Sequence, residues 1–144
     1  QTLNLFIHES SEIMKISFSK IFITSTKEGL ALKKKILPRL EKAKIEFVDL
    51  GAKDESEQGD VIDVCIDLAK NMKATENAGG IIITGFGSDA AMVMNKFSGI
   101  RCAFCNDYYT AKMTREHNDS NVLALAGDVV GSHVAMEMVE IFMQ

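Results

Sequence analysis

An alternation of short apolar runs with segments of helical spacing is the feature that most limits how this chain can fold. The runs are continuously apolar, as in "III" at 81–83 and "VLALA" at 122–126. Strands of this kind are buried on both faces, which happens when helices cover both sides of a parallel sheet. The pattern predicts strands at 18–24, 45–50, 79–84, 100–106 and 121–126, alternating with helices at 28–42, 61–73, 88–96, 107–117 and 129–143.

This order of strands and helices predicts an α/β fold, a single-domain Rossmann-like three-layer sandwich with a five-stranded parallel sheet. A chain of 144 residues is long enough for one such domain and its core. We expect an N-terminal extension at 1–17 and the α/β domain at 18–144. In the helix at 28–42, the basic residues are expected to point outward from the apolar stripe.

Charge and hydropathy limit the kinds of partner. The formal net charge is −4, so no overall positive field attracts nucleic acid. No run approaches the roughly 20 apolar residues of a membrane span. The start of the chain carries Glu9 and Glu12 and lacks a basic segment, unlike a secretory signal. We therefore expect a cytoplasmic protein with no nucleic-acid or membrane partner.

The three cysteines do not form a convincing metal site. Cys102 and Cys105 lie three residues apart in a predicted strand, where side chains at that spacing point to opposite faces. Cys65 is distant in sequence, and no second pair completes a zinc site. All three are interpreted as reduced, small apolar residues, so no metal is expected.

Ligands of such a sheet bind beyond the carboxyl ends of its strands, and one segment there is informative. In "TGFGSDAA", Gly85 and Gly87 allow unusual backbone angles, while Ser88 and Asp89 open a helix. A turn of this kind aims backbone N–H groups at one point, which suits an anion. Glycines are also common at tight strand-to-helix turns, and Ser88 or Asp89 could serve only as an N-cap.

A second polar cluster precedes the last apolar run, in "TREHNDSNVLALAG" at 114–127. Together with "NKFSGIR" at 95–101, it resembles the ribose-5-phosphate isomerase type B family, which includes both subunits of galactose-6-phosphate isomerase. That family's pattern contains A-N-K-x-x-G-I-R and R-x-H-N-D-x-N-V-L-A. The resemblance covers about residues 21–143, and the segment at 60–70 is most similar to the A subunit of galactose-6-phosphate isomerase.

The resemblance implies an aldose–ketose isomerase that acts on a sugar phosphate without a metal or cofactor. It implies that His117 opens the sugar ring and that Asn118 hydrogen-bonds the sugar. Gly85, Gly87 and the amide of Ser88 would bind the negative enediolate. In this family the histidine reaches a pocket completed by the neighbouring subunit, so a homodimer or higher homo-oligomer is expected.

The sequence departs from the family pattern at several site positions. Thr26 and Lys27 replace an aspartate and a phosphate-binding histidine, and Thr84 replaces the cysteine that transfers the proton. A threonine hydroxyl is a far weaker base than a thiolate near pH 7. Phe86 replaces a threonine, and the family's C-terminal G-G-R-H segment and a further arginine are absent from this sequence.

Three interpretations follow from these departures. The chain is an A-type subunit that needs a B-type partner subunit, or a self-sufficient isomerase in which Asp89 is the base and Lys27 binds phosphate. The third is a sugar-phosphate-binding or structural homologue that no longer catalyses. The candidate residues are His117, Asp89 and Thr84 for catalysis, and Asn118, Gly85, Gly87, Ser88, Lys27 and Thr26 for substrate binding, with no metal ligands.

Overall fold

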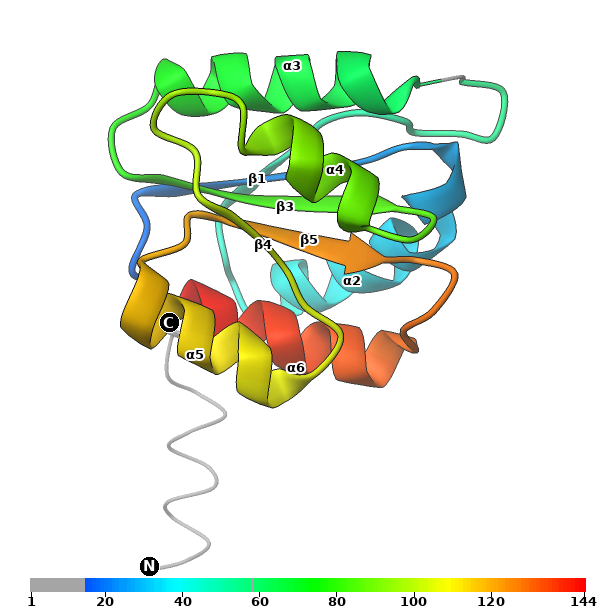
Figure 1. Ribbon diagram of the computed structural model, residues 1–144. Coiled ribbons are helices and arrows are strands. Elements are labelled where there is room, and N and C mark those ends of the chain that lie inside the picture. Colours follow the sequence, from blue (N-terminus) through cyan, green and yellow to red (C-terminus); the bar gives the residue numbers. More distant parts are fainter. Residues whose placement is uncertain (1–14, 58) are drawn as a thin grey trace, which may run out of the picture.

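The predicted apolar runs form one parallel sheet in the computed structural model, which describes residues 15–57 and 59–144 (Figure 1). Within those residues the sheet has five strands in the order β2-β1-β3-β5-β4. All neighbouring pairs are parallel, which confirms the predicted α/β class. The strands are β1 (Lys20–Ser25), β2 (Phe47–Asp49), β3 (Ala78–Thr84), β4 (Cys102–Phe104) and β5 (Val122–Ala126).

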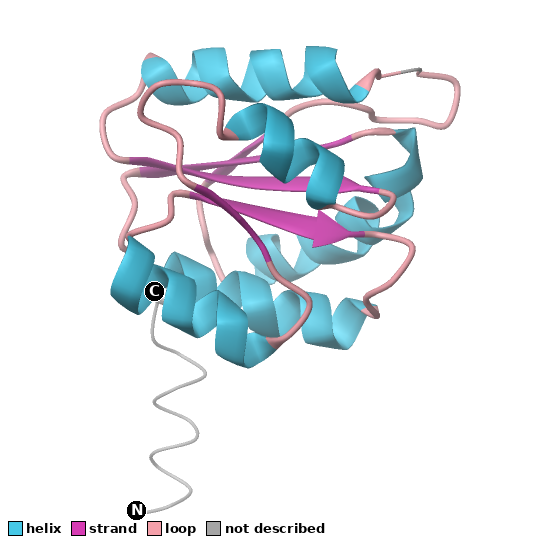
Figure 2. Ribbon diagram, viewed as in Figure 1, coloured by secondary structure: helices cyan, strands magenta, loops and turns pink. Residues whose placement is uncertain are grey.

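Helices cover both faces of the sheet, so the molecule has three layers (Figure 2). One layer contains α3 (Val61–Lys73) and α4 (Ser88–Met94), and the other contains α2 (Leu30–Lys42), α5 (Tyr108–Asn118) and α6 (Ser132–Met143). The predicted helix at 28–42 is divided, because a 3-10 turn, η1 (Lys27–Gly29), precedes α2. The last helix starts at Ser132 rather than at 129.

Two apolar cores lie on the two faces of the sheet. Ile81 and Ile83 of β3 pack into the core against α2, α5 and α6, whereas Ile82 packs into the core against α3 and α4. Successive side chains of a strand point to opposite faces, so a strand between two helical layers must be apolar at every position. This geometry explains why the runs in the sequence are continuous.

The two edge strands are shorter than predicted. We expected strands at 45–50 and 100–106, but β2 and β4 have three residues each. An edge strand has a ladder partner on one side only, so little backbone pairing extends it. On β4 the Asn95 side chain accepts from the Cys102 N–H (2.7 Å) and donates to the Cys102 carbonyl (2.9 Å), outside the ladder with β5.

The cysteines lie as the strand period predicted. Cys105 packs into the core against α2, α5 and α6, and Cys102 packs against the core on the other face. All three thiols are free. Burial raises the pKa of both Cys65 and Cys102 to about 12, so these thiols are protonated near pH 7.

The described residues contain neither a membrane-spanning helix nor a cluster of metal-binding side chains. No helix among residues 15–57 and 59–144 is long and apolar enough to cross a membrane. The same residues hold no group of three or more His, Cys, Asp and Glu side chains placed to bind a metal ion.

Most of the expected N-terminal extension, residues 1–14, lies outside the described part of the chain. Ser17, at the end of that extension, donates its N–H to the Met143 carbonyl at 2.8 Å.

The expectation that the basic residues of 28–42 all point outward is wrong for Lys33. Its side chain is 1% exposed. Its ammonium forms an ion pair with Asp49 (2.7 Å) and donates to the carbonyls of Leu50 (2.8 Å) and Ala52. Helical spacing alone places Lys33 at the margin of the apolar stripe, and tertiary contacts decide that it is buried.

We expect Lys33→Met to lower the free energy of unfolding by about 3 kcal/mol, because it leaves Asp49 and two carbonyls without their cation. Urea denaturation measures the loss. Lys34→Met is the matched control, since Lys34 is exposed on the same helix and should change stability by less than about 0.5 kcal/mol. Equal effects of the two substitutions would show that the buried ion pair does not stabilise the fold.

Candidate active site

Three loops meet at the carboxyl ends of β1, β3 and β5. The Thr26 N–H bonds to the Ile83 carbonyl at 3.1 Å, which joins the loop after β1 to the end of β3. The Gly127 N–H bonds to the Thr84 carbonyl (2.7 Å) and the Asp128 N–H to the Gly85 carbonyl (2.9 Å), which joins the loops after β3 and β5. The candidate residues of 26–27 and 84–89 therefore lie together at the carboxyl ends of the strands, as predicted. We call this side the carboxyl edge of the sheet.

Thr84 and Asp89 form a hydrogen-bonded pair at this edge. The Thr84 hydroxyl accepts from the Gly87 N–H (2.9 Å) and donates to Asp89 Oδ1 (2.7 Å). The same Oδ1 accepts from the Ala90 N–H at 2.8 Å. Both bonds to the Asp89 carboxylate use Oδ1 and hold it in one orientation, and Oδ2 has no hydrogen-bond partner among the described residues. Asp89 is partly exposed, which keeps it accessible.

The turn was expected to aim free backbone N–H groups at an anion, but the N–H groups of Gly87 and Ser88 are already hydrogen-bonded. The Gly87 N–H is bonded to Thr84, and the Ser88 N–H is bonded to the Phe86 carbonyl at 2.9 Å. The N-cap expectation for Ser88 and Asp89 is also wrong, because Gly87 occupies that position and makes no side-chain cap bond. In this conformation the amides of Gly87 and Ser88 support the turn itself, so an anion would need other donors.

Gly87 is required by both its backbone angle and its surroundings. Its φ is +78°, and a Cβ there would lie 2.5 Å from the Phe104 ring. We expect Gly87→Ala to lower the free energy of unfolding by about 2 kcal/mol or more, from left-handed strain and overpacking.

Two glycines provide controls for that urea measurement. Gly99 has φ +80° but open space around it, so Gly99→Ala should lose only the strain, about 1 kcal/mol. Gly131 has φ −73° and open space, so Gly131→Ala should be nearly neutral. If Gly87→Ala were no worse than Gly99→Ala, close packing at this turn would be refuted.

Acidic side chains border the turn. A Cβ on Gly85 would lie 2.9 Å from Asp128 Oδ2 and 3.4 Å from the Cβ of Glu28, so both acidic residues border the loop beside Asp89. Lys27 is exposed in η1, in the loop after β1 that meets this edge. Asp128 was not selected from the sequence, although its segment "AGDVVG" follows a strand and so lies at the predicted ligand edge. The local charge of one chain disfavours a dianionic phosphate unless further cations approach.

The polar side chains at the end of β1 are buried. Thr24, Ser25 and Thr26 are each 1% exposed or less, and their hydroxyls have no hydrogen-bond partner among the described residues. A ligand reaches Thr26 only if the η1 turn moves. Direct substrate binding by Thr26, predicted from its position in the sequence, therefore gains no support from this conformation.

His117 and Asn118 lie on the opposite side, at the amino ends of the strands. We call this side the amino edge of the sheet. Helix α5 begins after the carboxyl end of β4 and runs back, so its last turn lies beside the amino end of β5 (Figure 1). Both residues are exposed. With seven residues in β3 and about 3.3 Å per residue, the two edges lie roughly 20 Å apart. One chain cannot bring His117 to Asp89, so the two act on one substrate only if they come from different copies.

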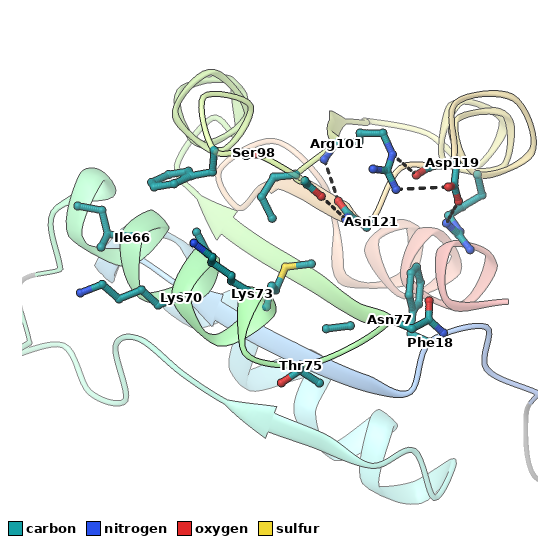
Figure 3. A pocket seen from close by; sticks show the side chains of 17 residues that line it. Phe18, Ile66, Lys70, Lys73, Thr75, Asn77, Ser98, Arg101, Asp119 and Asn121 are labelled. Atoms are coloured by element: carbon teal, nitrogen blue, oxygen red, sulfur yellow. Dashed lines mark hydrogen bonds and ion pairs between the residues drawn. The ribbon is translucent and has the colours of Figure 1, made fainter.

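The neighbours of His117 have structural roles. Asp119 ends α5 in the left-handed conformation (φ 49°) and forms ion pairs with Arg101 (3.3 Å) and Arg115 (3.5 Å) (Figure 3). The Asn121 side chain accepts from the Arg101 N–H and donates to the Gly99 carbonyl, each at 2.8 Å. The motif therefore contains residues that build the corner, while His117 projects from it.

Comparison with known proteins gives consistent matches over most of the chain. The family described as Ribose/Galactose Isomerase matches residues 21–144. Ribose-5-phosphate isomerase B of Escherichia coli K12 is 37% identical over 112 residues, which are 78% of this chain and 74% of the relative. Galactose-6-phosphate isomerase subunit LacA 2 of Streptococcus pyogenes serotype M3 is 32% identical over 124 residues, 86% of this chain and 85% of the relative.

A solved structure shows the same arrangement in space. Ribose-5-phosphate isomerase B of Clostridium thermocellum has a TM-score of 0.80 and 37% identity, over 87% of this chain and 84% of that chain. The matched regions include both the Thr84–Asp89 turn and the end of α5 that carries His117.

Proposed function

The chain belongs to the Ribose/Galactose Isomerase family, and on that premise we propose that it interconverts the aldose and ketose forms of a sugar phosphate through an enediolate. The hydrogen-bonded pair of Thr84 and Asp89 carries this proposal. It places an oriented, partly exposed carboxylate beside the position where Thr84 replaces the family's cysteine. We also propose a cytoplasmic location, since three free thiols favour a reducing compartment.

Asp89 is the proton-transfer base in this proposal. Its Oδ2 removes the proton from the carbon next to the carbonyl, and the electrons of that C–H bond form the enediolate. The same carboxyl group then returns the proton to the adjacent carbon, while the hydroxyl proton moves from one enediolate oxygen to the other, so no net proton is gained or lost. Thr84 keeps the carboxylate in place through the 2.7 Å bond to Oδ1. The Ser88 hydroxyl and Lys27 ammonium supply donors that the bonded backbone amides do not.

His117 of a second copy opens the sugar ring, with Asn118 beside it to bind the sugar. Imidazole can both give and accept a proton near neutral pH, as ring opening requires. The single chain separates His117 from Asp89 by the length of the sheet, so the active form is at least a dimer in which the amino edge of one copy meets the carboxyl edge of the other.

Exposed apolar side chains near β4 support association. Phe86, Met92 and Tyr109 are 59%, 71% and 67% exposed, and Phe104 lies on the edge strand. Exposed apolar side chains that form one contiguous patch often mark a protein contact. Met94, in the same helix as Met92, is fully buried in the core, so Met92 is the methionine of α4 that is available for a contact.

The proposal is tested by assaying the purified chain against five- and six-carbon aldose phosphates. Turnover with deuterium incorporation from solvent at the carbon next to the carbonyl is expected, because the enediolate exchanges its proton through Asp89. Turnover that begins only when a cysteine-bearing homologue is added would favour the A-type subunit interpretation. Ligand-induced thermal stabilisation without turnover in either case would favour a binding protein.

A further inference from the structure

A cavity of about 660 Å³ opens at the amino edge of the sheet, away from the Thr84–Asp89 turn. It lies between the end of α3, the segment 97–101 before β4 and the end of α5 (Figure 3). Small-molecule sites commonly measure about 300–1,000 Å³, so this amino-edge cavity has the size of a ligand pocket. The proposed reaction uses none of the side chains on its α3 wall.

The floor of the amino-edge cavity is apolar. Met72, Ala69 and Ala78 are buried beneath it, and half-buried apolar side chains extend the surface toward the opening. An apolar floor favours a ligand with a ring system or other apolar body. The contributing side chains are Ile66, Ala69, Met72, Ala78, Phe97 and Ile100.

The rim of the cavity is cationic. Among the described residues that line it, four are cationic and one is acidic. The cationic residues are Lys70, Lys73, Arg101 and Arg115, and the acidic residue is Asp119. Figure 3 shows Lys73 on the α3 side and Arg101 on the opposite side. Lysines in the last turn of α3 also complement the helix dipole, but that effect does not account for the two arginines. The excess of positive charge favours an anionic ligand.

The arginines are held in place and are incompletely neutralised. Arg101 Nε donates to the Asp119 carbonyl at 2.7 Å, and Arg115 Nη1 donates to the Ser120 carbonyl at 2.6 Å. Both guanidinium groups share the one Asp119 carboxylate. Arg115 stacks over the Phe18 ring at 4.4 Å, and its buried Nε has no hydrogen-bond partner among the described residues. Positioned cations with spare charge form a preorganised anion site.

We propose that the amino-edge cavity binds an organic phosphate of nucleotide size, with its ring system on the apolar floor and its phosphate at the cationic rim. A sugar phosphate is polar over most of its surface and would leave the apolar floor exposed. A nucleoside monophosphate uses both parts of the cavity. Its α3 wall and apolar floor lie apart from the Thr84–Asp89 turn of the same chain, so AMP binding does not require the proposed isomerase activity.

The test titrates the full chain with AMP, ribose 5-phosphate and inorganic phosphate, and follows backbone amides by NMR and affinity by calorimetry. AMP is expected to shift the amides of Thr75, Ser98 and Gly99 and to bind more tightly than the other two. Lys73→Ala should weaken AMP binding at least about tenfold, because a charge-assisted contact is lost. Ser98→Glu, at an exposed position on the rim, should weaken it at least as much by repulsion.

Lys35→Ala is the matched control, since it removes one exposed lysine from α2 and should leave AMP affinity unchanged. Circular dichroism checks that each variant is folded. Three results would overturn the proposal: shifts confined to 84–89, equal weakening by Lys35→Ala and Lys73→Ala, or inorganic phosphate binding as tightly as AMP. The last would mean that the apolar floor takes no part.

Discussion

Replacing Asp89 with Asn is expected to lower kcat by at least about a hundredfold, because a general base typically contributes on the order of 10²–10⁴ in rate. Asn keeps the shape of the side chain, and its Oδ1 can still accept from Thr84 and Ala90, so the turn and ligand binding should be nearly unchanged. Steady-state kinetics and deuterium exchange measure the effect. Both should fall together, since both depend on removal of the same proton.

Asp128→Asn is the matched control, because it removes the same charge beside Gly85 without removing the proposed base. It should change kcat by less than about tenfold, and it should lower KM for a phosphorylated substrate by reducing repulsion. An Asp89→Asn protein with near-parental kcat would remove Asp89 from the mechanism. Equal losses of kcat in the two variants would mean that the negative charge of this edge matters, rather than a specific base.

Mixing two inactive variants is expected to restore activity if the site is shared between copies. His117→Ala should slow turnover of the closed-ring substrate far more than that of an open-chain substrate, since ring opening is its role. After unfolding and refolding Asp89→Asn together with His117→Ala, half of the dimers are mixed, and each mixed dimer has one intact site of two. The refolded mixture should therefore recover about a quarter of the parental activity.

A mixture of Asp89→Asn and Thr84→Val is the control, because both substitutions lie at the same edge and no intact site forms in any dimer. Restored activity in that mixture would contradict a site built from two opposite edges. Failure of the first mixture to exceed the sum of its parents, or sedimentation as a monomer at micromolar concentration, would contradict the proposed dimer.

The sequence alone predicted the layers of the fold because burial on two faces demands apolar residues at every position of a strand. Ile81 and Ile83 pack on one face of the sheet and Ile82 on the other, as expected for a parallel sheet between helices. The edge strands β2 and β4 do not need an apolar residue at every position. The sequence pattern therefore predicted both strands to be longer than they are. The burial of Lys33 was missed because its partners, Asp49 and two carbonyls, are distant in sequence.

For the candidate site, the sequence by itself determined which residue types are present: a glycine turn with Asp89, a motif with His117, and threonine in place of the family's cysteine. Only the tertiary structure decided how they are placed. It hydrogen-bonds Thr84 to Asp89 and uses the amides of Gly87 and Ser88 in bonds within the turn. It also places Asp128 beside Gly85. It also separates His117 from Asp89, because a helix that follows a parallel strand must return to the opposite edge before the next strand can begin.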